Sequence, residues 1–334
     1  MPSTAMVCVV IAAKDAAATI GRAVGSALRD ARVSEVVVVD DGSADRTAEA
    51  ALGADDGSGR LLILRLDANR GPSFARNHAI AHSRAPLIAV LDADDFFLED
   101  RFDRLLEGDD WDFVADNIVF IDAAAAGQGE PAVPDFAAEP RFLDLAAFVE
   151  GNISRRGAAR GEIGFLKPVM RRAFLDAHRL RYDEKLRLGE DYDLYARALL
   201  EGARYKVVHG CGYGAVVRAE SLSGRHRTAD LKRLYEADRA ILALPAALGE
   251  AKTALRRHER HMRARHELRH FLDLKAERGL LRAGLRALAR PSALPAIVGG
   301  VAADKLDALR AGIGRADGET ALPRYLLAAR TIQK

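Results

Sequence analysis

The sequence predicts an α/β fold in which a mostly parallel sheet carries helices on both faces. Four short, mainly apolar runs in the first hundred residues predict strands, at residues 6–11, 36–39, 61–66 and 87–91, and the continuous apolar run at 6–11 is typical of a strand buried on both faces. Apolar residues at helical spacing follow two of these runs, at residues 19–28 and 72–82. Repeated strand–helix units of this kind form parallel sheets covered by helices.

The rest of the chain divides near residue 225. Before that point the sequence predicts a strand at 112–120, a loop rich in Ala, Gly and Pro at 123–140, helices at 143–149 and 190–201, and short strands at 205–208 and 214–218. Beyond residue 228, Arg, Ala and Leu dominate with helical periodicity. We therefore expect one α/β domain over residues 1–225 and an α-helical region over residues 226–334.

Composition bounds the class of protein. The chain has 334 residues, of which 49% are hydrophobic and 29% charged, as in ordinary well-cored proteins. Its two cysteines, Cys8 and Cys211, give no disulfide framework, and Cys8 lies in an apolar run that predicts a buried thiol. No secretory signal is visible, and the longest late apolar stretch, residues 293–303, is too short to span a bilayer. These features predict a cytoplasmic protein.

The charges are unevenly distributed. Residues 225–334 contain 23 Lys and Arg against 12 Asp and Glu, and the preceding residues contain 27 against 36. The overall net charge of +2 is thus the sum of an acidic N-terminal region, with a net charge of −9, and a basic C-terminal region, with a net charge of +11. This asymmetry predicts different partners for the two regions.

Acidic residues follow two of the predicted strands: Asp40 and Asp41 after the second, and Asp92, Asp94 and Asp95 after the fourth. Ligands of an open parallel sheet bind beyond the carboxyl ends of its strands. Carboxylates two positions apart in an extended segment point to one side, where both can meet a hard cation. Mg²⁺ or Mn²⁺ held there would stabilise a diphosphate leaving group. Each cluster alone is equally compatible with an acidic turn or a helix cap.

Five segments follow one another along the chain: VVVVDDGS at 36–43, RGPSFARN at 70–77, LDADD at 91–95, GEDYDL at 189–194 and RAESLS at 218–223. Together they resemble the successive motifs of the large inverting, GT-A glycosyltransferase family 2. Each motif is weak, but their order and spacing agree over roughly residues 5–225. The resemblance implies a nucleotide-sugar-binding half at residues 1–120 and an acceptor-binding half at residues 121–225.

The resemblance also implies roles for individual residues. Asp191 would be the catalytic base, and Asp94, with Asp92, would hold the Mn²⁺ or Mg²⁺ ion. Donor binding falls to a larger group, which comprises Ala12, Ala13, Asp15, Asp40, Asp41, Arg70, Arg76, Asp92 and Ala93. Supporting positions are Asn77, Asp95, Lys167, Glu190, Arg218, Ser221, Ser223 and His226.

Asp191 suits the role of base on physical grounds. An inverting transfer is one in-line displacement, so one carboxylate suffices to activate the acceptor hydroxyl opposite the departing diphosphate. Asp191 would begin a helix that presents Leu194 and Leu199 to the core, and so would be rigidly held. The alternative is that Glu190 and Asp191 merely favour the helix N-terminus. Lys167 could similarly meet donor phosphate or an anionic acceptor, or be solvated surface charge.

Two departures narrow the expected enzyme. After the first strand the family often carries Pro-x-Tyr-Asn, whereas this chain has Ala12-Ala13-Lys14-Asp15, so the stacking on the base must differ. Processive synthases of the family carry Gln-x-x-Arg-Trp and transmembrane helices, but the only Trp here is Trp111. A single-addition enzyme that acts on a saccharide acceptor is therefore expected, in a surface polysaccharide or glycoconjugate pathway.

The basic tail has two interpretations. Arg282, Arg286 and Arg290 recur every four residues beside Leu281, Leu285 and Leu288, a pattern typical of a helix at an anionic membrane surface. Such contact would bring the enzyme to a lipid-linked acceptor at the inner face of the cell membrane. Alternatively, these helices pack on the catalytic domain or on a second subunit of a homodimer. Nucleic acid is not expected as a partner, because interleaved aromatic residues are missing.

Two other functions remain open from the sequence. A nucleotidyltransferase that makes activated sugars would share the α/β fold and the metal carboxylates, but it would normally show a Gly-rich triphosphate loop after the first strand. A non-catalytic module that binds nucleotide sugar as a regulator would not need the acids at 94 and 191.

Overall fold

The computed structural model describes residues 6–123, 133, 141–154, 162–217, 227–311 and 324–327. The chain forms two compact units, one comprising Met1–Ser221 with Pro323–Lys334 and the other Leu222–Leu322. The predicted loop at 123–140 lies almost entirely outside the described residues.

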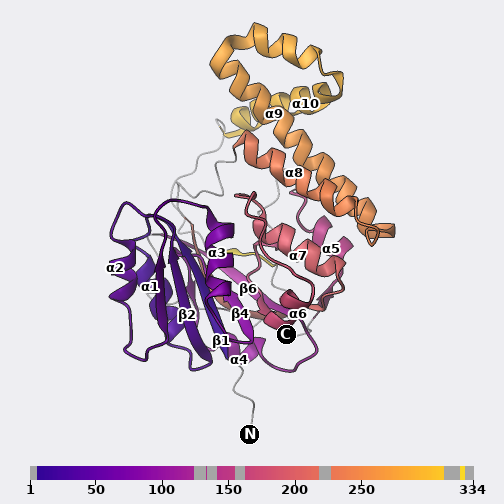
Figure 1. Cartoon of the computed structure of the whole chain (residues 1–334). Helices are drawn as coiled ribbons and strands as arrows, with labels where there is room; N and C mark the ends of the chain where they lie inside the picture. The colour runs from indigo at the N-terminus through magenta and orange to yellow at the C-terminus, as the bar shows by residue number, and fades with distance from the viewer. Residues whose placement is uncertain are drawn as a thin grey trace. The chain divides into compact units, whose positions relative to one another are not determined.

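The first unit begins with the predicted parallel sheet. Strands β1 (Val7–Ala13), β2 (Val33–Asp40), β3 (Leu61–Arg65) and β4 (Leu87–Val90) pair in the order β3-β2-β1-β4, all parallel. Figure 1 shows this sheet between helices α1 (Ile20–Leu28) and α2 (Thr47–Leu52) on one side and α3 (Pro72–Ala81) on the other. Residues 7–11 of β1 are fully buried, as continuous apolar runs predict. Burial also raises the pKa of the Cys8 thiol to about 12.

The sheet continues with mixed strand directions. Strand β8 (Val169–Arg171) is antiparallel to both β4 and β6 (Phe113–Asp122), and β6 is parallel to β9 (Tyr205–Val217). The short strands β5 (Phe96–Phe97) and β7 (Arg141–Leu143) pair antiparallel with β9. Helices α4 (Arg101–Leu105), α5 (Leu145–Glu150), α6 (Arg172–Ala177) and α7 (Glu190–Leu200) and a 3₁₀ turn (Ile163–Phe165) connect these strands.

Strand β9 corrects the sequence prediction of two short strands. Residues 205–217 form one strand, and its glycines alternate along one face. A Cβ on Gly210 would lie 2.9 Å from Nε of Arg104, and one on Gly214 would lie 2.5 Å from the Phe96 ring. At Gly212 the obstruction is Arg101, together with Asp116. These glycines therefore do not break the strand; they make room for side chains that cross its face.

Helix α7 is anchored by aromatic residues. Tyr195 is fully buried and makes edge contacts with Phe113, Phe148 and Tyr205, with ring centroids 5.9–6.3 Å apart. Gly189, with φ +72°, precedes the helix in the left-handed region that glycine tolerates best. This packing fixes the first turn of α7, where Glu190 and Asp191 lie.

The second unit is helical over its described part. It contains α8 (Thr228–Leu242), α9 (Gly249–Leu288) and α10 (Leu294–Ala311), with a break inside α9 at Gly279, where φ is 79° and ψ is 165°. Among the described residues, no helix is sufficiently long and apolar to span a membrane.

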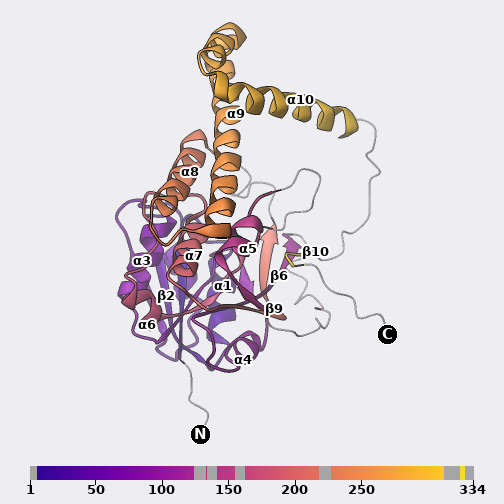
Figure 2. The same ribbon diagram turned by 90° about the vertical axis from the view of Figure 1, so that its right-hand side faces the viewer.

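The chain end differs from the prediction of a wholly helical region after residue 225. Strand β10 (Arg324–Tyr325) pairs antiparallel with β6 of the first unit, as Figure 2 shows. The first unit is thus completed by residues that follow the helical one in sequence.

Candidate active site

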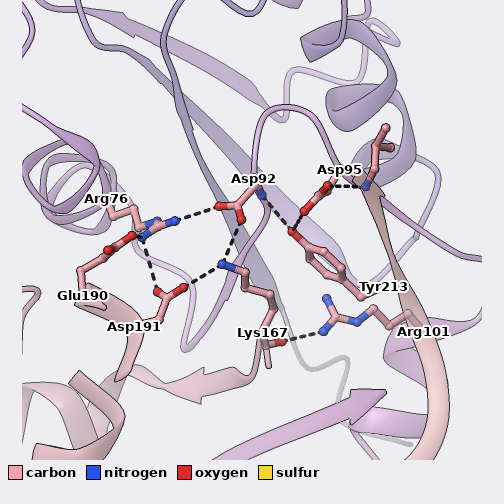
Figure 3. Close-up of polar contacts among 9 residues, drawn as sticks. Arg76, Asp92, Asp95, Arg101, Lys167, Glu190, Asp191 and Tyr213 are labelled. Atoms are coloured by element: carbon pink, nitrogen blue, oxygen red, sulfur yellow. Dashed lines mark hydrogen bonds and ion pairs between the residues drawn. The ribbon is translucent and has the colours of Figure 1, made fainter. Parts of the chain in front are cut away.

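Charged side chains from four parts of the first unit converge beyond the carboxyl ends of the parallel strands. Asp92 follows β4, Arg76 comes from α3, Lys167 precedes β8, and Glu190 and Asp191 form the first turn of α7. Figure 3 shows Arg76 and Lys167 alternating with the carboxylates. We call these five residues the ionic cluster.

Each cation of the ionic cluster bridges two or more acids. Nη2 of Arg76 lies 2.8 Å from Asp92, and its Nη1 lies 2.8 Å from Glu190 and 3.4 Å from Asp191. Nζ of Lys167 lies 2.9 Å from Asp92 and 2.7 Å from Asp191. The predicted base and the first acid of the Asp-x-Asp motif are therefore joined through shared cations.

Burial makes these ion pairs strong. The side chains of Arg76 and Lys167 are 5% and 6% exposed, and that of Asp191 is 11% exposed. Burial opposes the charge on Lys167, but Asp191 and Asp92 raise its pKa above the ordinary value; Asp191, Asp92 and Glu190 do the same for Arg76. Burial alone would raise the pKa of Asp92, yet Lys167 and Arg76 hold it well below its usual range.

A buried ion pair behind the cluster positions Lys167. Arg101 of α4 and Asp116 of β6 are each 1% exposed and lie 3.0 Å apart. Nη2 of Arg101 also donates to the backbone carbonyl of Lys167 at 2.6 Å. Lys167 is therefore not a solvated surface charge, and the hydrogen bond from Arg101 fixes the position of its backbone.

The remaining acids of the Asp-x-Asp segment have separate environments. Oδ2 of Asp95 accepts a hydrogen bond from the Tyr213 hydroxyl at 2.7 Å, and its Oδ1 accepts one from the backbone N–H of Val216 at 2.9 Å. Burial, followed by repulsion from Asp92 and Asp94, raises the pKa of Asp95 well above its usual range. Tyr213 also accepts from the backbone N–H of Asp92, and so couples the segment to β9. Asp94 is half-buried, and Ala93 is buried.

The loops after β1 and β2 are joined to one another. Nζ of Lys14 donates to the carbonyl of Gly42 at 2.6 Å, and the Asp15 carboxylate accepts from the backbone N–H of Ala44 at 2.7 Å. Asp40, 1% exposed, accepts from the backbone N–H of Ser43 through Oδ1. Its buried Oδ2 makes no hydrogen bond with the described residues and lies 3.5 Å from Nε of Arg65. Ala12 and Ala13 end β1 beside this loop.

Asp41 and Asn77 organise neighbouring backbone. The two oxygens of Asp41 accept from the backbone N–H groups of Arg70 and Gly71, at 2.6 and 2.8 Å. Asn77 exchanges two hydrogen bonds with the backbone of Tyr182. The Arg70 guanidinium lies over the Phe74 ring, 3.3 Å from its centroid. The predicted donor-binding segment is thus rigidly held at the start of α3.

Some predicted residues lie outside the described part of the chain: Arg218, Ser221, Ser223 and His226. Other residues of the site were not identified from the sequence: Arg101, Asp116, Tyr182 and Tyr213. Their only sequence signal is a charged or hydroxyl-bearing side chain within an otherwise apolar segment, a pattern too common to be diagnostic.

Comparison with known proteins identifies the family. Residues 8–176 match the family Glycosyl transferase family 2. The chain is 64% identical to the succinoglycan biosynthesis protein ExoU of Rhizobium meliloti (strain 1021), over 91% of this chain and 89% of that protein. It is 38% identical to ExoO, also named a succinoglycan biosynthesis protein, of the same organism, over 85% and 82% of the two chains.

A solved structure supports the fold. S. aureus TarS 1-349 in complex with UDP-GlcNAc superposes with a TM-score of 0.58 at 20% sequence identity, over 87% of this chain and 79% of that one. The predicted GT-A type of α/β fold is confirmed by this likeness, and family membership decides against the nucleotidyltransferase and regulatory alternatives. The family match covers half of the chain, and the identity to ExoU extends over 91% of it. The chain therefore belongs to glycosyl transferase family 2 and is a glycosyltransferase.

Proposed function

We propose that this enzyme transfers one sugar from a nucleoside diphosphate donor to a hydroxyl of a saccharide acceptor, with inversion at the anomeric carbon. The observation that carries the proposal is the juxtaposition of Asp191 with Asp92 through Lys167 and Arg76. It brings a carboxylate on a rigid helix beside the segment in which the family motif locates the donor diphosphate.

Asp191 acts as the base in this proposal. The acceptor O–H gives its proton to a carboxylate oxygen of Asp191 while the acceptor oxygen bonds to the anomeric carbon and the bond from that carbon to the diphosphate oxygen breaks. The products are the glycoside, the nucleoside diphosphate and a protonated Asp191, which later releases its proton to water. Arg76 and Lys167 each contact one oxygen of Asp191 and leave further lone pairs for this proton.

The two cations would exchange partners when the donor binds. Arg76 and Lys167 are the buried positive groups nearest the predicted diphosphate site, and phosphate oxygens are strong acceptors for both. A diphosphate that takes one hydrogen bond from Lys167 would weaken the pair between Lys167 and Asp191. The base would then become available mainly in the donor complex.

A divalent cation fits the charge balance of the site. With its acids ionised, the ionic cluster carries three negative and two positive charges, so it does not by itself attract a diphosphate. We assign Mn²⁺ or Mg²⁺ to Asp94, together with donor phosphate oxygens, since such ions need few protein carboxylates. Asp92 could join them only by giving up a cation partner. When bound, the ion would supply charge stabilisation of the leaving diphosphate.

The base-binding end of the donor is assigned to the loops after β1 and β2. The buried Oδ2 of Asp40 makes no hydrogen bond with the described residues and only a long ion pair, 3.5 Å, with Arg65, so it suits an N–H group of a nucleobase. The neighbouring backbone of Ala12, Ala13 and Asp15 would border the base. S. aureus TarS has been solved with UDP and with UDP-GlcNAc, which supports a uridine diphosphate sugar as donor here.

The proposed pathway is bacterial exopolysaccharide assembly of the succinoglycan type. Its support is that both Rhizobium meliloti relatives are named succinoglycan biosynthesis proteins and that the match to ExoU covers most of both chains. The acceptor would be a growing saccharide on a lipid carrier at the cytoplasmic face of the membrane.

Asp191→Asn tests the reaction. We expect turnover per folded molecule to fall at least about a hundredfold, because the proton acceptor is lost, while donor affinity measured by calorimetry stays the same or rises, because Asp191 no longer competes with the diphosphate for Lys167. Asp193→Asn is the matched control: Asp193 is buried on the same helix but pairs with Arg197. Turnover that survives in Asp191→Asn would rule out the base.

In the same assay donor binding should require Mn²⁺ or Mg²⁺, and binding that ignores both ions would rule out the metal.

A further inference from the structure

The end of helix α9 buries small residues and exposes large ones. Beyond the break at Gly279, Ala283 and Ala287 are 1% and 8% exposed, whereas Leu281 and Leu285 are 85% and 68% exposed. Leu288, at 64%, follows the same pattern. An ordinary surface helix does the reverse, because burying leucine stabilises a fold far more than burying alanine.

Three of the four exposed leucines in this segment form one face, and the fourth, Leu280, is not part of it. Positions 281, 285 and 288 have the spacing i, i+4, i+7, so their side chains lie along one stripe of the helix. On another side, Ala287 packs with Ala293 and Ile297, and Phe271 covers this small core. The alanines therefore attach the segment to its own unit and leave the leucine stripe for a partner. We call Leu281, Leu285 and Leu288 the leucine stripe.

The segment that carries the leucine stripe is basic in sequence. Residues 278–302 contain four arginines and no acidic residue. Arg282 and Arg286 follow Leu281 and Leu285 by one position each, and so lie along the flank of the stripe. Arg286 and Arg290 also line a hollow with Glu267, His270 and Phe271.

We propose that this segment is an interfacial helix that inserts the leucine stripe into an anionic bilayer while its arginines meet lipid phosphates. An apolar face beside a basic flank is the composition of helices that lie in a membrane surface. A second copy of the chain fits less well, because a symmetric contact would bring the same arginines together and residues 278–302 provide no acid to neutralise them. The inference rests on the proposed function, in which the acceptor is lipid-linked, and it identifies the surface of the enzyme that would bind the membrane carrying that acceptor.

Vesicle flotation of the full chain, without donor or acceptor, tests the proposal independently of catalysis. We expect binding to phosphatidylcholine vesicles that contain phosphatidylglycerol, and little binding to pure phosphatidylcholine. Leu281→Ser/Leu285→Ser should weaken binding at least about tenfold through lost apolar burial. Arg282→Gln and Arg286→Gln should each weaken it about fivefold, with less effect at high salt.

Leu52→Ser/Leu248→Ser is the matched control, since it removes two leucines of similar exposure, 61% and 66%, away from the stripe. It should bind vesicles like the parent chain. A reporter variant, Leu285→Trp, should shift its emission to the blue on anionic vesicles, because its indole would leave water. Absence of vesicle binding, binding that is insensitive to the serine pair, or a dimer that the serine pair dissociates would each overturn the proposal.

Discussion

At the scale of single residues, the site depends on one buried lysine that joins two carboxylates. Lys167 stands between Asp92 and Asp191, and the Arg101–Asp116 pair holds its backbone. A buried cation of this kind serves stability and function together, because removing it leaves two acids that were partly neutralised by it.

Lys167→Met should therefore lower the free energy of unfolding by about 3 kcal/mol, the lower end for breaking a buried pair, since Asp92 keeps some contact with water. Urea denaturation measures the change, and donor affinity should fall as well. Lys206→Met is the control: Lys206 pairs with Asp110, which is 53% exposed, so its loss should cost no more than about 1 kcal/mol. Equal costs for the two variants would contradict the bridging role.

At the scale of elements, β9 shows most clearly what the sequence hides. The three glycines between residues 210 and 214 suggest a break between two short strands, since glycine is rare inside strands. In the structure they make room for Arg104, Arg101 and Phe96, contacts that depend on elements about a hundred residues away. No local pattern carries that information.

Gly212→Ala should destabilise the catalytic unit by about 1–3 kcal/mol, because its Cβ would come within 2.6 Å of Oδ2 of Asp116 and would also strike Arg101. Turnover should fall with it, as this pair supports Lys167. Gly25→Ala, inside α1 with open space around the new Cβ, should instead gain about 0.5–1 kcal/mol. Thermal unfolding of the two variants compares them directly, and a loss of stability in both would refute the steric argument.

At the scale of the whole molecule, the sequence predicted the parallel strands of the sheet, but it did not predict which distant segments complete the sheet and the site. Continuous apolar runs define β1, β2, β3 and β4, and the acids that follow two of them mark the edge where ligands bind. The pairing of β8, the position of Lys167 and the return of β10 depend instead on contacts between distant segments. Strand β10 illustrates this, since only two residues pair and their sequence has no strand signal.

The return of the chain end has a measurable consequence for the catalytic unit. Asn117 of β6 is buried, and its side chain donates to the carbonyl of Leu327 at 3.0 Å and accepts from the backbone N–H of Leu327 at 2.8 Å. Leu326, at 6% exposure, donates its backbone N–H to the carbonyl of Ile118 at 2.9 Å. Deletion of residues 323–334 should leave the Asn117 amide without these partners, at a cost of about 2 kcal/mol.

A double-mutant cycle isolates that contact. Asn117→Ala should cost about 1–2 kcal/mol in the full chain, where it breaks two hydrogen bonds to Leu327 and one from the backbone N–H of Ile118, and markedly less after deletion of residues 323–334, where the two bonds to Leu327 are already lost. Urea denaturation followed by the fluorescence of Trp111, which is buried in the catalytic unit, reports on the correct unit. Equal costs in the two backgrounds would mean that the chain end and β6 are energetically independent, whereas a coupling makes residues beyond the helical unit part of the catalytic fold.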